Sequence, residues 1–286
     1  GDALMDSLRS FARGLVVLGV LLAMSTVSWA GSPKDVDIVA HRGASYDAPE
    51  NTLASINLAW ERGADAVEID VYLSADGRIV AAHDATTKRT AGVDRKVVEQ
   101  TLEELKALDV GRWKETRFAG ERIPTLEEIL KTVPDGRRMF IEVKCGPEVV
   151  EELRRVCARS GKSPWQTTVI SFNLDVIREV KKSMPGVPAY WVLGVTPAEP
   201  DPNEPKNVPL GQRIPAAKEA GADGLDVNWK SGIDAEYLNT VRRAGLELHA
   251  WTVNDAEQAR KLAAVGIDSI TTDRPGWLRE QIEATR

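Results

Sequence analysis

The sequence has few of the residues that disulfide scaffolds, zinc sites and nucleic-acid-binding surfaces depend on. Its 286 residues include only two cysteines and three histidines, without a CxxC pair or a Cys/His metal spacing, which excludes a disulfide scaffold and speaks against a zinc site. Lys and Arg number 37 against 43 Asp and Glu, a net charge of −6, so nucleic acid is not expected as a partner. At 43% hydrophobic and 28% charged residues, the chain can build one large globular core.

No hydrophobic run reaches the roughly 20 residues that a membrane-spanning helix needs. The apolar stretch at residues 15–27 is shorter, follows two arginines and precedes small residues, which is the pattern of a secretory signal. We therefore expect residues 1–30 to be a signal peptide, with residues 1–4 an added tag ahead of the initiator Met5. The mature chain, 31–286, would be periplasmic or secreted, with no stable membrane span after cleavage; a membrane anchor is the alternative.

The two cysteines do not define a pairing. In an oxidising compartment Cys145 and Cys157 could form one disulfide bond. Because Cys145 follows a strand candidate and Cys157 lies in the next helix candidate, two free thiols are at least as consistent with the sequence.

From residue 37 onward, short β-branched runs alternate with amphipathic helical stretches, which is typical of βαβ units around a parallel sheet. Eight strand candidates lie at residues 38–40, 66–71, 139–143, 168–171, 189–193, 224–227, 247–251 and 269–271. Eight such units predict an α/β fold of the TIM type, a closed (β/α)8 barrel with its chemistry at the strand ends. An open doubly wound sheet is the alternative, but no GxGxxG motif follows the first strand.

Three segments depart from this alternation. A ninth strand at 79–82 follows a short Asp-Gly turn and predicts a hairpin, which would set position 82 opposite position 70 and bring His83 close to the acids of the second strand. The polar stretch 85–124, with one helix candidate at 101–108, is interpreted as an insertion subdomain over the barrel mouth. Residues 196–210 contain five prolines and form either a lid or a surface loop.

Two of the three histidines directly follow strand candidates, His41 in an HRG motif and His83 in an HD motif. In a barrel, both would lie at the catalytic face. A lone histidine at a strand end is more often structural, but two together beside acids suggest a general acid and a general base, because imidazole exchanges protons near neutral pH. His249, within a strand candidate, is interpreted as structural.

Three acids lie inside strand candidates, where burial of a carboxylate is unfavourable unless another group neutralises it. Glu68 and Asp70 alternate along one strand and so share a face, about 7 Å apart along the chain, while Glu142 lies on another strand. Converging carboxylates repel one another unless a cation neutralises them. Oxygen ligands favour a hard divalent ion, Mg²⁺ or Ca²⁺, although Lys144 could instead pair with one of the acids.

Two cations accompany these acids. Arg42 and Lys144 follow strand candidates, and their positive charge beside a metal points to an anionic substrate such as a phosphate ester. Gly43 would let the backbone approach such a ligand closely. The residues alone therefore predict metal-dependent phosphodiester cleavage.

The motifs also resemble a known family. The segments IVAHRGASYDAPENTLASI, GADAVEIDVYLSADGRIVAAHD and FIEVK, followed by AWTVND and ITTDRP, are similar in order and spacing to the glycerophosphodiester phosphodiesterase family over about residues 37–277. The resemblance implies a (β/α)8 barrel with a small insertion after the HD motif. It further implies the acid–base pair His41 and His83, the divalent metal ligands Glu68, Asp70 and Glu142, and the phosphate-binding residues Arg42 and Lys144. Glu50 matches a position beside the metal, and Phe172 and Trp251 match residues that either line the pocket or pack the barrel.

The implied activity is hydrolysis of small glycerophosphodiesters to sn-glycerol 3-phosphate and an alcohol. Water and the substrate's own glycerol 2-hydroxyl both stay open as the attacking group, as do the preferred alcohol and the oligomeric state. A lysophospholipase D or sphingomyelinase-like phosphodiesterase is the first alternative. A non-catalytic phosphodiester-binding barrel is the second, which the retention of every histidine and acid of the motifs disfavours.

Overall fold

The computed structural model describes residues 36–194 and 210–284. The expected signal peptide and nearly all of the proline-rich stretch 196–210 lie outside the described residues. Within them, no helix is both long and apolar enough to cross a membrane. Cys145 and Cys157 are both free thiols in this part of the chain.

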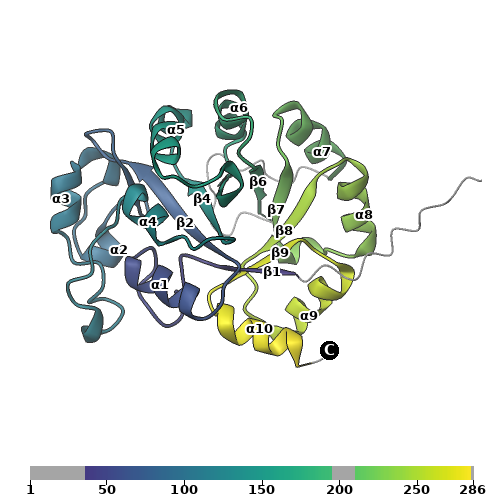
Figure 1. Cartoon of the computed structure of the whole chain (residues 1–286), viewed down its shortest axis with the longest axis horizontal. Coiled ribbons are helices and arrows are strands. Elements are labelled where there is room, and N and C mark those ends of the chain that lie inside the picture. The colour runs from purple at the N-terminus through teal and green to yellow at the C-terminus, as the bar shows by residue number, and fades with distance from the viewer. Residues whose placement is uncertain (1–35, 195–209, 285–286) are drawn as a thin grey trace, which may run out of the picture. The chain divides into compact units, whose positions relative to one another are not determined.

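Eight parallel strands close into a barrel, and a ninth strand pairs antiparallel with the second (Figure 1). The strands are β1 Asp37–Ala40, β2 Ala66–Leu73, β3 Ile79–Ala81, β4 Arg138–Val143, β5 Thr167–Ser171, β6 Ala189–Leu193, β7 Gly224–Asn228, β8 Glu247–Trp251 and β9 Ser269–Thr272. The first strand pairs with both β2 and β9, which closes the ring. The predicted (β/α)8 barrel is therefore confirmed, with the expected strands displaced by no more than a residue or two at their ends.

Helices surround this barrel, as Figure 1 shows. They are α1 Leu53–Glu61, α2 Lys88–Ala91, α3 Leu102–Ala107, α4 Leu126–Thr132, α5 Val150–Arg159, α6 Leu174–Ser183, α7 Leu210–Glu219, α8 Ala235–Arg243, α9 Ala256–Val265 and α10 Pro275–Glu283. One-turn 3-10 helices add η1 Val97–Glu99, η2 Thr116–Phe118, η3 Pro147–Val149, η4 Pro164–Gln166 and η5 Trp229–Ser231. The main core lies between strands and helices and contains most of the fully buried aliphatic residues.

The barrel interior is filled by layers of side chains, because inward-facing residues of alternate strands meet at one level. The deepest aromatic layer contains Phe140, Tyr190 and His249, with Tyr190 and His249 stacked at 4.2 Å between ring centroids. His249 is 1% exposed and its Nδ1 lies 2.7 Å from Ser269 Oγ. This packing agrees with the structural role expected for His249.

The hairpin precedes the residues that the sequence analysis interprets as an insertion. Val71 pairs with Ala81, and the backbone N–H of Ala82 donates to Asp70 O at 3.1 Å, so position 82 faces position 70 as expected. Beyond the hairpin, α2 and α3 lie to one side of the barrel (Figure 1). A small second core holds this part together against the outer face of the hairpin; its buried members are Val80, Val97, Leu105, Val110 and Ile123.

Candidate active site

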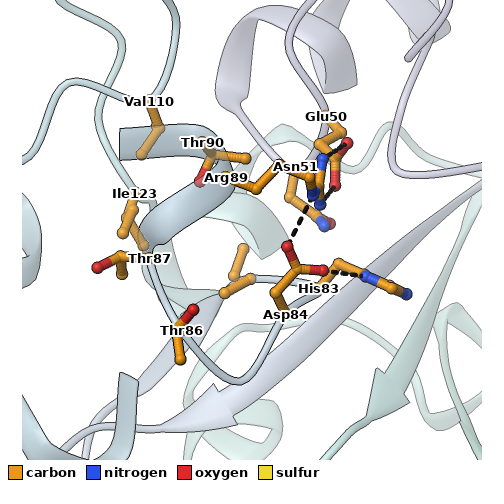
Figure 2. Close-up of a pocket in the computed structure, with 12 residues that line it drawn as sticks. Glu50, Asn51, His83, Asp84, Thr86, Thr87, Arg89, Thr90, Val110 and Ile123 are labelled. Carbon is orange, nitrogen blue, oxygen red and sulfur yellow. Dashed lines mark hydrogen bonds and ion pairs between the residues drawn. The ribbon is translucent and has the colours of Figure 1, made fainter. Parts of the chain in front are cut away.

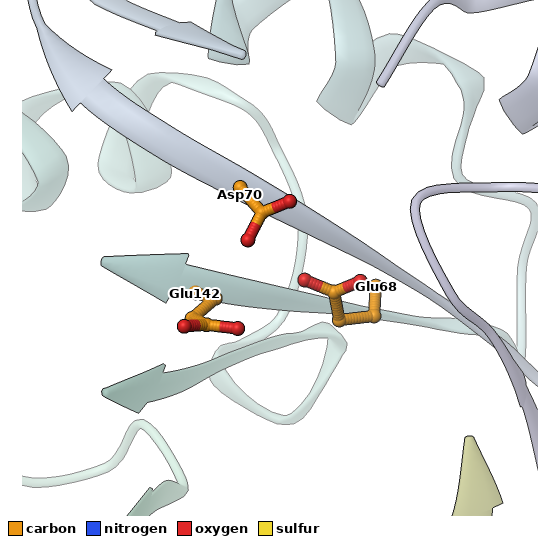
Figure 3. A group of neighbouring side chains, drawn as sticks. All are labelled: Glu68, Asp70 and Glu142. Atoms are coloured by element: carbon orange, nitrogen blue, oxygen red, sulfur yellow. The ribbon is translucent and has the colours of Figure 1, made fainter. Parts of the chain in front are cut away.

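Three acids meet inside the carboxyl end of the barrel. Glu68 and Asp70 come from β2 and Glu142 from β4, where Asp70 and Glu142 are register partners. One oxygen from each carboxylate lies within 4.8 Å of the others, and Figure 3 shows all three groups turned toward one another. The structure thus brings together the three residues that the sequence suggested as metal ligands.

The electrostatics of this triad fit a cation. Burial raises the pKa of Glu68 well above its ordinary value, and the nearby Asp70 and Glu142 raise it further. Among the described residues, Glu68 Oε1 is buried without a hydrogen-bond partner. A buried, unpaired carboxylate oxygen is costly, so an oxygen-seeking divalent ion would satisfy what the protein leaves open.

Asp70 is held ionised by its neighbours. Burial alone would raise its pKa, but its polar neighbours, led by the charges of Arg42 and Lys144, together outweigh burial and lower the pKa to about 2. The side-chain amide of Asn51 adds a hydrogen bond of 2.9 Å to Asp70 Oδ2, and Asn51 Oδ1 accepts from the Asp70 backbone N–H at 3.1 Å. This two-way contact fixes the carboxylate in one orientation.

The loop between β1 and α1 adopts a tight conformation that turns Arg42 back into the site. Arg42 has φ +54°, in the left-handed region that non-glycine residues seldom adopt. Its backbone N–H donates to Glu68 at 2.9 Å, and its side chain contacts Asp70 at 3.2 Å and Glu50 at 3.0 Å. Gly43 follows at φ +83°, where a Cβ would lie 2.5 Å from Ser55 Oγ. Glycine is therefore required for this close approach to α1.

Lys144 is the second cation beside the acids. Its Nζ lies 2.8 Å from Glu142 and 3.8 Å from Asp70, so the ion pair that was the alternative to a metal does form. The same Nζ lies 5.5 Å from the centre of the Phe172 ring. The rings of Phe172 and Trp251 pack edge to face, with their centroids 5.6 Å apart. Phe172 and Trp251 therefore pack the barrel mouth and also border the charged site.

His41 has a carboxylate partner from the other end of the chain. Its Nδ1 lies 2.6 Å from Asp273 Oδ1, which also accepts from Ser45 Oγ at 3.1 Å. Burial alone would raise the pKa of Asp273, but the hydrogen bond and charge of His41, together with hydrogen bonds from Asn254 and Ser45, outweigh burial and lower the pKa to about 2. A carboxylate on Nδ1 sets the ring's orientation and leaves Nε2 as the nitrogen that exchanges protons.

His83 is held in a similar way by the residue that follows it. Its Nδ1 lies 2.7 Å from Asp84 Oδ1, and Arg89 Nε donates to Asp84 Oδ2 at 2.7 Å. The guanidinium of Arg89, on α2 of the insertion, also binds both oxygens of Glu50 at 2.8 and 2.7 Å. Figure 2 shows these contacts as dashed lines that link His83 through Asp84 and Arg89 to Glu50. Glu50 therefore forms ion pairs with both Arg42 and Arg89 and does not belong to the group of three acids.

Several site residues were not anticipated from the sequence. Asp273 and Asp84 lie in motifs that were recognised, but neither was assigned the role of orienting a histidine. Arg89 lies in a polar insertion that offers no local pattern. Asn51, like Arg42, has a positive φ of 57°, and the PENT segment gave no sign of that conformation.

A closed barrel whose strand ends gather ionisable side chains is the architecture of a TIM-barrel enzyme. The model of the glycerophosphoryl diester phosphodiesterase family matches residues 41–277. A glycerophosphodiester phosphodiesterase of Caldanaerobacter subterraneus subsp. tengcongensis is 33% identical, over 84% of this chain and 95% of that protein. Another, from Bacillus subtilis, is 29% identical over 93% and 95% of the two chains. The chain belongs to the glycerophosphodiester phosphodiesterase family.

A solved structure agrees with this assignment. The Oleispira antarctica phosphodiesterase, in complex with its product sn-glycerol-3-phosphate, superimposes with a TM-score of 0.77 at 30% identity. The match covers 87% of this chain and 97% of the other. The resemblance inferred from the motifs is confirmed in family and fold.

Proposed function

We propose that this enzyme hydrolyses glycerophosphodiesters to sn-glycerol 3-phosphate and an alcohol, in a reaction that requires a divalent cation. One observation carries the proposal: two carboxylate-bound histidines, a buried acidic triad and two cations meet at the carboxyl ends of the barrel strands. The product bound by the Oleispira antarctica relative supports the same reaction.

The triad Glu68, Asp70 and Glu142 would hold Mg²⁺ or Ca²⁺. All three ligands offer carboxylate oxygens, and the unpartnered Glu68 Oε1 needs a positive charge. When bound, the ion would withdraw charge from the phosphoryl oxygens of the substrate. Arg42 and Lys144 are already placed beside these acids and would bind the phosphate from two sides.

His41 and His83 would divide the proton transfers. Asp273 holds His41 by Nδ1 and Asp84 holds His83 by Nδ1, so both rings would exchange protons through Nε2. One imidazole takes the proton of the attacking hydroxyl, and the other protonates the departing alkoxide. Attack by water would give sn-glycerol 3-phosphate directly, whereas attack by the glycerol 2-hydroxyl would first give a cyclic phosphate, which water then opens to sn-glycerol 3-phosphate. Phe172 and Trp251 would border the glycerol or alcohol moiety at the mouth.

We further propose that residues 31–286 form the exported enzyme and that residues 85–124 act as its insertion subdomain. The signal-like composition of residues 1–30 supports the first point. The separate small core behind the hairpin supports the second.

The test is the release of glycerol 3-phosphate by purified residues 31–286 from a panel of water-soluble glycerophosphodiesters and lysophospholipids. His41→Ala and His83→Ala should each abolish turnover and keep the circular dichroism spectrum of the wild type. Near-native activity in either variant contradicts the assigned roles. Release of a phosphorylated lipid from lysophospholipids alone would instead favour the lysophospholipase D alternative, and inactivity of the folded protein on every substrate would favour a binding barrel.

A further inference from the structure

A fourth carboxyl group lies inside the barrel without an assigned role. Asp226, on β7, is 3% exposed, and its Oδ1 has no hydrogen-bond partner among the described residues. Few buried polar atoms in folded proteins lack a partner, and an isolated buried carboxyl group is among the costliest to leave so. A contribution to packing alone would be better served by an apolar residue at this position.

The strand registers place Asp226 at the level of Glu68, the innermost acid of the triad. Val192, Asp226 and His249 are register partners across β6, β7 and β8, and Glu68 and Phe140 are partners across β2 and β4. Because the strands of such a barrel are tilted, a level layer takes its side chains from alternate strands. With the observed registers, the layer that contains Asp226 is completed by Glu68, Ile170 and Thr271.

Asp226 and Glu68 therefore face each other across the interior, above the aromatic layer of Phe140, Tyr190 and His249. Glu142 belongs to the next layer toward the mouth. Each of the facing residues has one oxygen that is buried without a partner. The other members of the shared layer, Ile170 and Thr271, bring no charge, so no cationic side chain in this layer compensates the two acids.

The electrostatics agree with this placement. Burial raises the pKa of Asp226 well above its ordinary value, and the charge of Glu142 raises it further. Glu142 thus lies close enough to influence Asp226 through the low-dielectric interior. Asp226 is nevertheless outside the group of ligand atoms within 4.8 Å of one another, so it is not a direct member of the triad.

We infer that Asp226 is a positioning residue of the cation centre, which accepts a hydrogen bond from a water molecule on the inner side of the bound ion. This inference rests on the proposed function, because it requires a cation at Glu68, Asp70 and Glu142. Groups behind the direct ligands orient them and strengthen metal binding, and losing one such group typically weakens affinity by about 10- to 100-fold. The water would satisfy the open oxygen of Asp226, while the ion satisfies that of Glu68.

Isothermal titration calorimetry with MgCl₂ and with CaCl₂, after chelator treatment of residues 31–286, tests this inference without relying on turnover. Asp226→Asn keeps the size of the side chain and replaces the carboxyl group with an amide that cannot ionise. We expect the Kd of the preferred ion to rise by about 10- to 100-fold, while the melting temperature of the metal-free protein does not fall. The metal-induced rise in melting temperature should shrink accordingly.

Thr168→Val is the matched control. Thr168 Oγ1 is also buried without a partner, but it belongs to the floor of the same barrel interior, below the aromatic layer. This variant should bind the ion as the wild type does. If Asp226→Asn fails to fold by circular dichroism, Asp226→Ser, which leaves room for water, serves as the second variant with the same expected loss.

The outcomes separate the two proposals. A wild-type protein that binds the ion, together with a folded Asp226 variant whose Kd is within twofold of it, overturns the inference and leaves the proposed function intact. Equal weakening in the Thr168 control also overturns it, since the effect would then reflect general loosening of the barrel. A wild-type protein that binds neither ion contradicts the cation centre itself, and the inference with it.

Discussion

The contact between His41 and Asp273 allows a quantitative prediction for Asp273→Asn. The two groups are 2.6 Å apart and only 19% and 30% exposed, so this is a charge-assisted hydrogen bond in a partly dry site. Such bonds contribute about 1.5–3 kcal/mol, which corresponds to about 10- to 150-fold in rate. Because the proton transfer depends on the orientation of the ring, we expect the loss in kcat, with KM little changed.

The assay is initial-rate release of glycerol 3-phosphate at saturating cation. Ser45→Ala is the control, because it removes only the longer 3.1 Å hydrogen bond that an uncharged hydroxyl donates to the same Asp273 oxygen. At this length the bond is expected at the lower limit for a hydrogen bond to a charged group, about 1.5 kcal/mol, so kcat in Ser45→Ala should fall by about tenfold at most. A kcat of Asp273→Asn within twofold of the wild-type value, or a rise in KM without a fall in kcat, would refute the reasoning.

Three further predictions follow from individual contacts. Arg89→Met removes the guanidinium that binds both Asp84 and Glu50. Taking the lower limit for a hydrogen bond to a charged group, we expect kcat/KM to fall about tenfold. In Lys88→Met, which breaks only an exposed ion pair, kcat/KM should stay within twofold of the wild type. Gly43→Ala should lower the free energy of unfolding by at least about 2 kcal/mol in urea titrations, and by clearly more than Gly63→Ala, where φ is also positive but nothing lies within 4 Å of a new Cβ. For acid stability, the Asp273 pKa of about 2 lies below an unfolded value of about 3.9, so its contribution is full above pH 4 and fades as the pH falls toward 2. The melting temperatures of wild type and Asp273→Asn should therefore converge over that interval; a constant gap would contradict this origin.

The barrel could be predicted because its strands are buried on both faces. Such strands stand out as short apolar runs between helical stretches, and only their ends differ from expectation: β2 continues to Leu73 and β7 to Asn228. The Asp-Gly turn also sufficed to place position 82 opposite position 70. The insertion's fold could not be derived, because its small core depends on contacts with the outer face of the hairpin.

The acids, cations and histidines at strand ends could be predicted from barrel geometry, but their partners could not. His41 and Asp273 are 232 positions apart in the chain, and only the closure of β1 against β9 brings them together. Arg89 reaches Glu50 from a polar segment without periodicity. Asp226 could have been noticed in the sequence, because an acid inside the apolar run of β7 is as unusual as Glu68 and Asp70 are in β2. A nearby cation, the explanation given for those two acids, applies to it as well.

The central claim is that the acidic triad binds a divalent cation that phosphodiester hydrolysis requires. The most direct measurement is release of glycerol 3-phosphate from a water-soluble glycerophosphodiester by purified residues 31–286, first after chelator treatment and then during titration with Mg²⁺ or Ca²⁺. We predict no turnover in the chelated enzyme and saturable recovery with one of the two ions, with no recovery in Glu68→Gln. Full activity of the chelated enzyme, or equal recovery in Glu68→Gln, would contradict the claim.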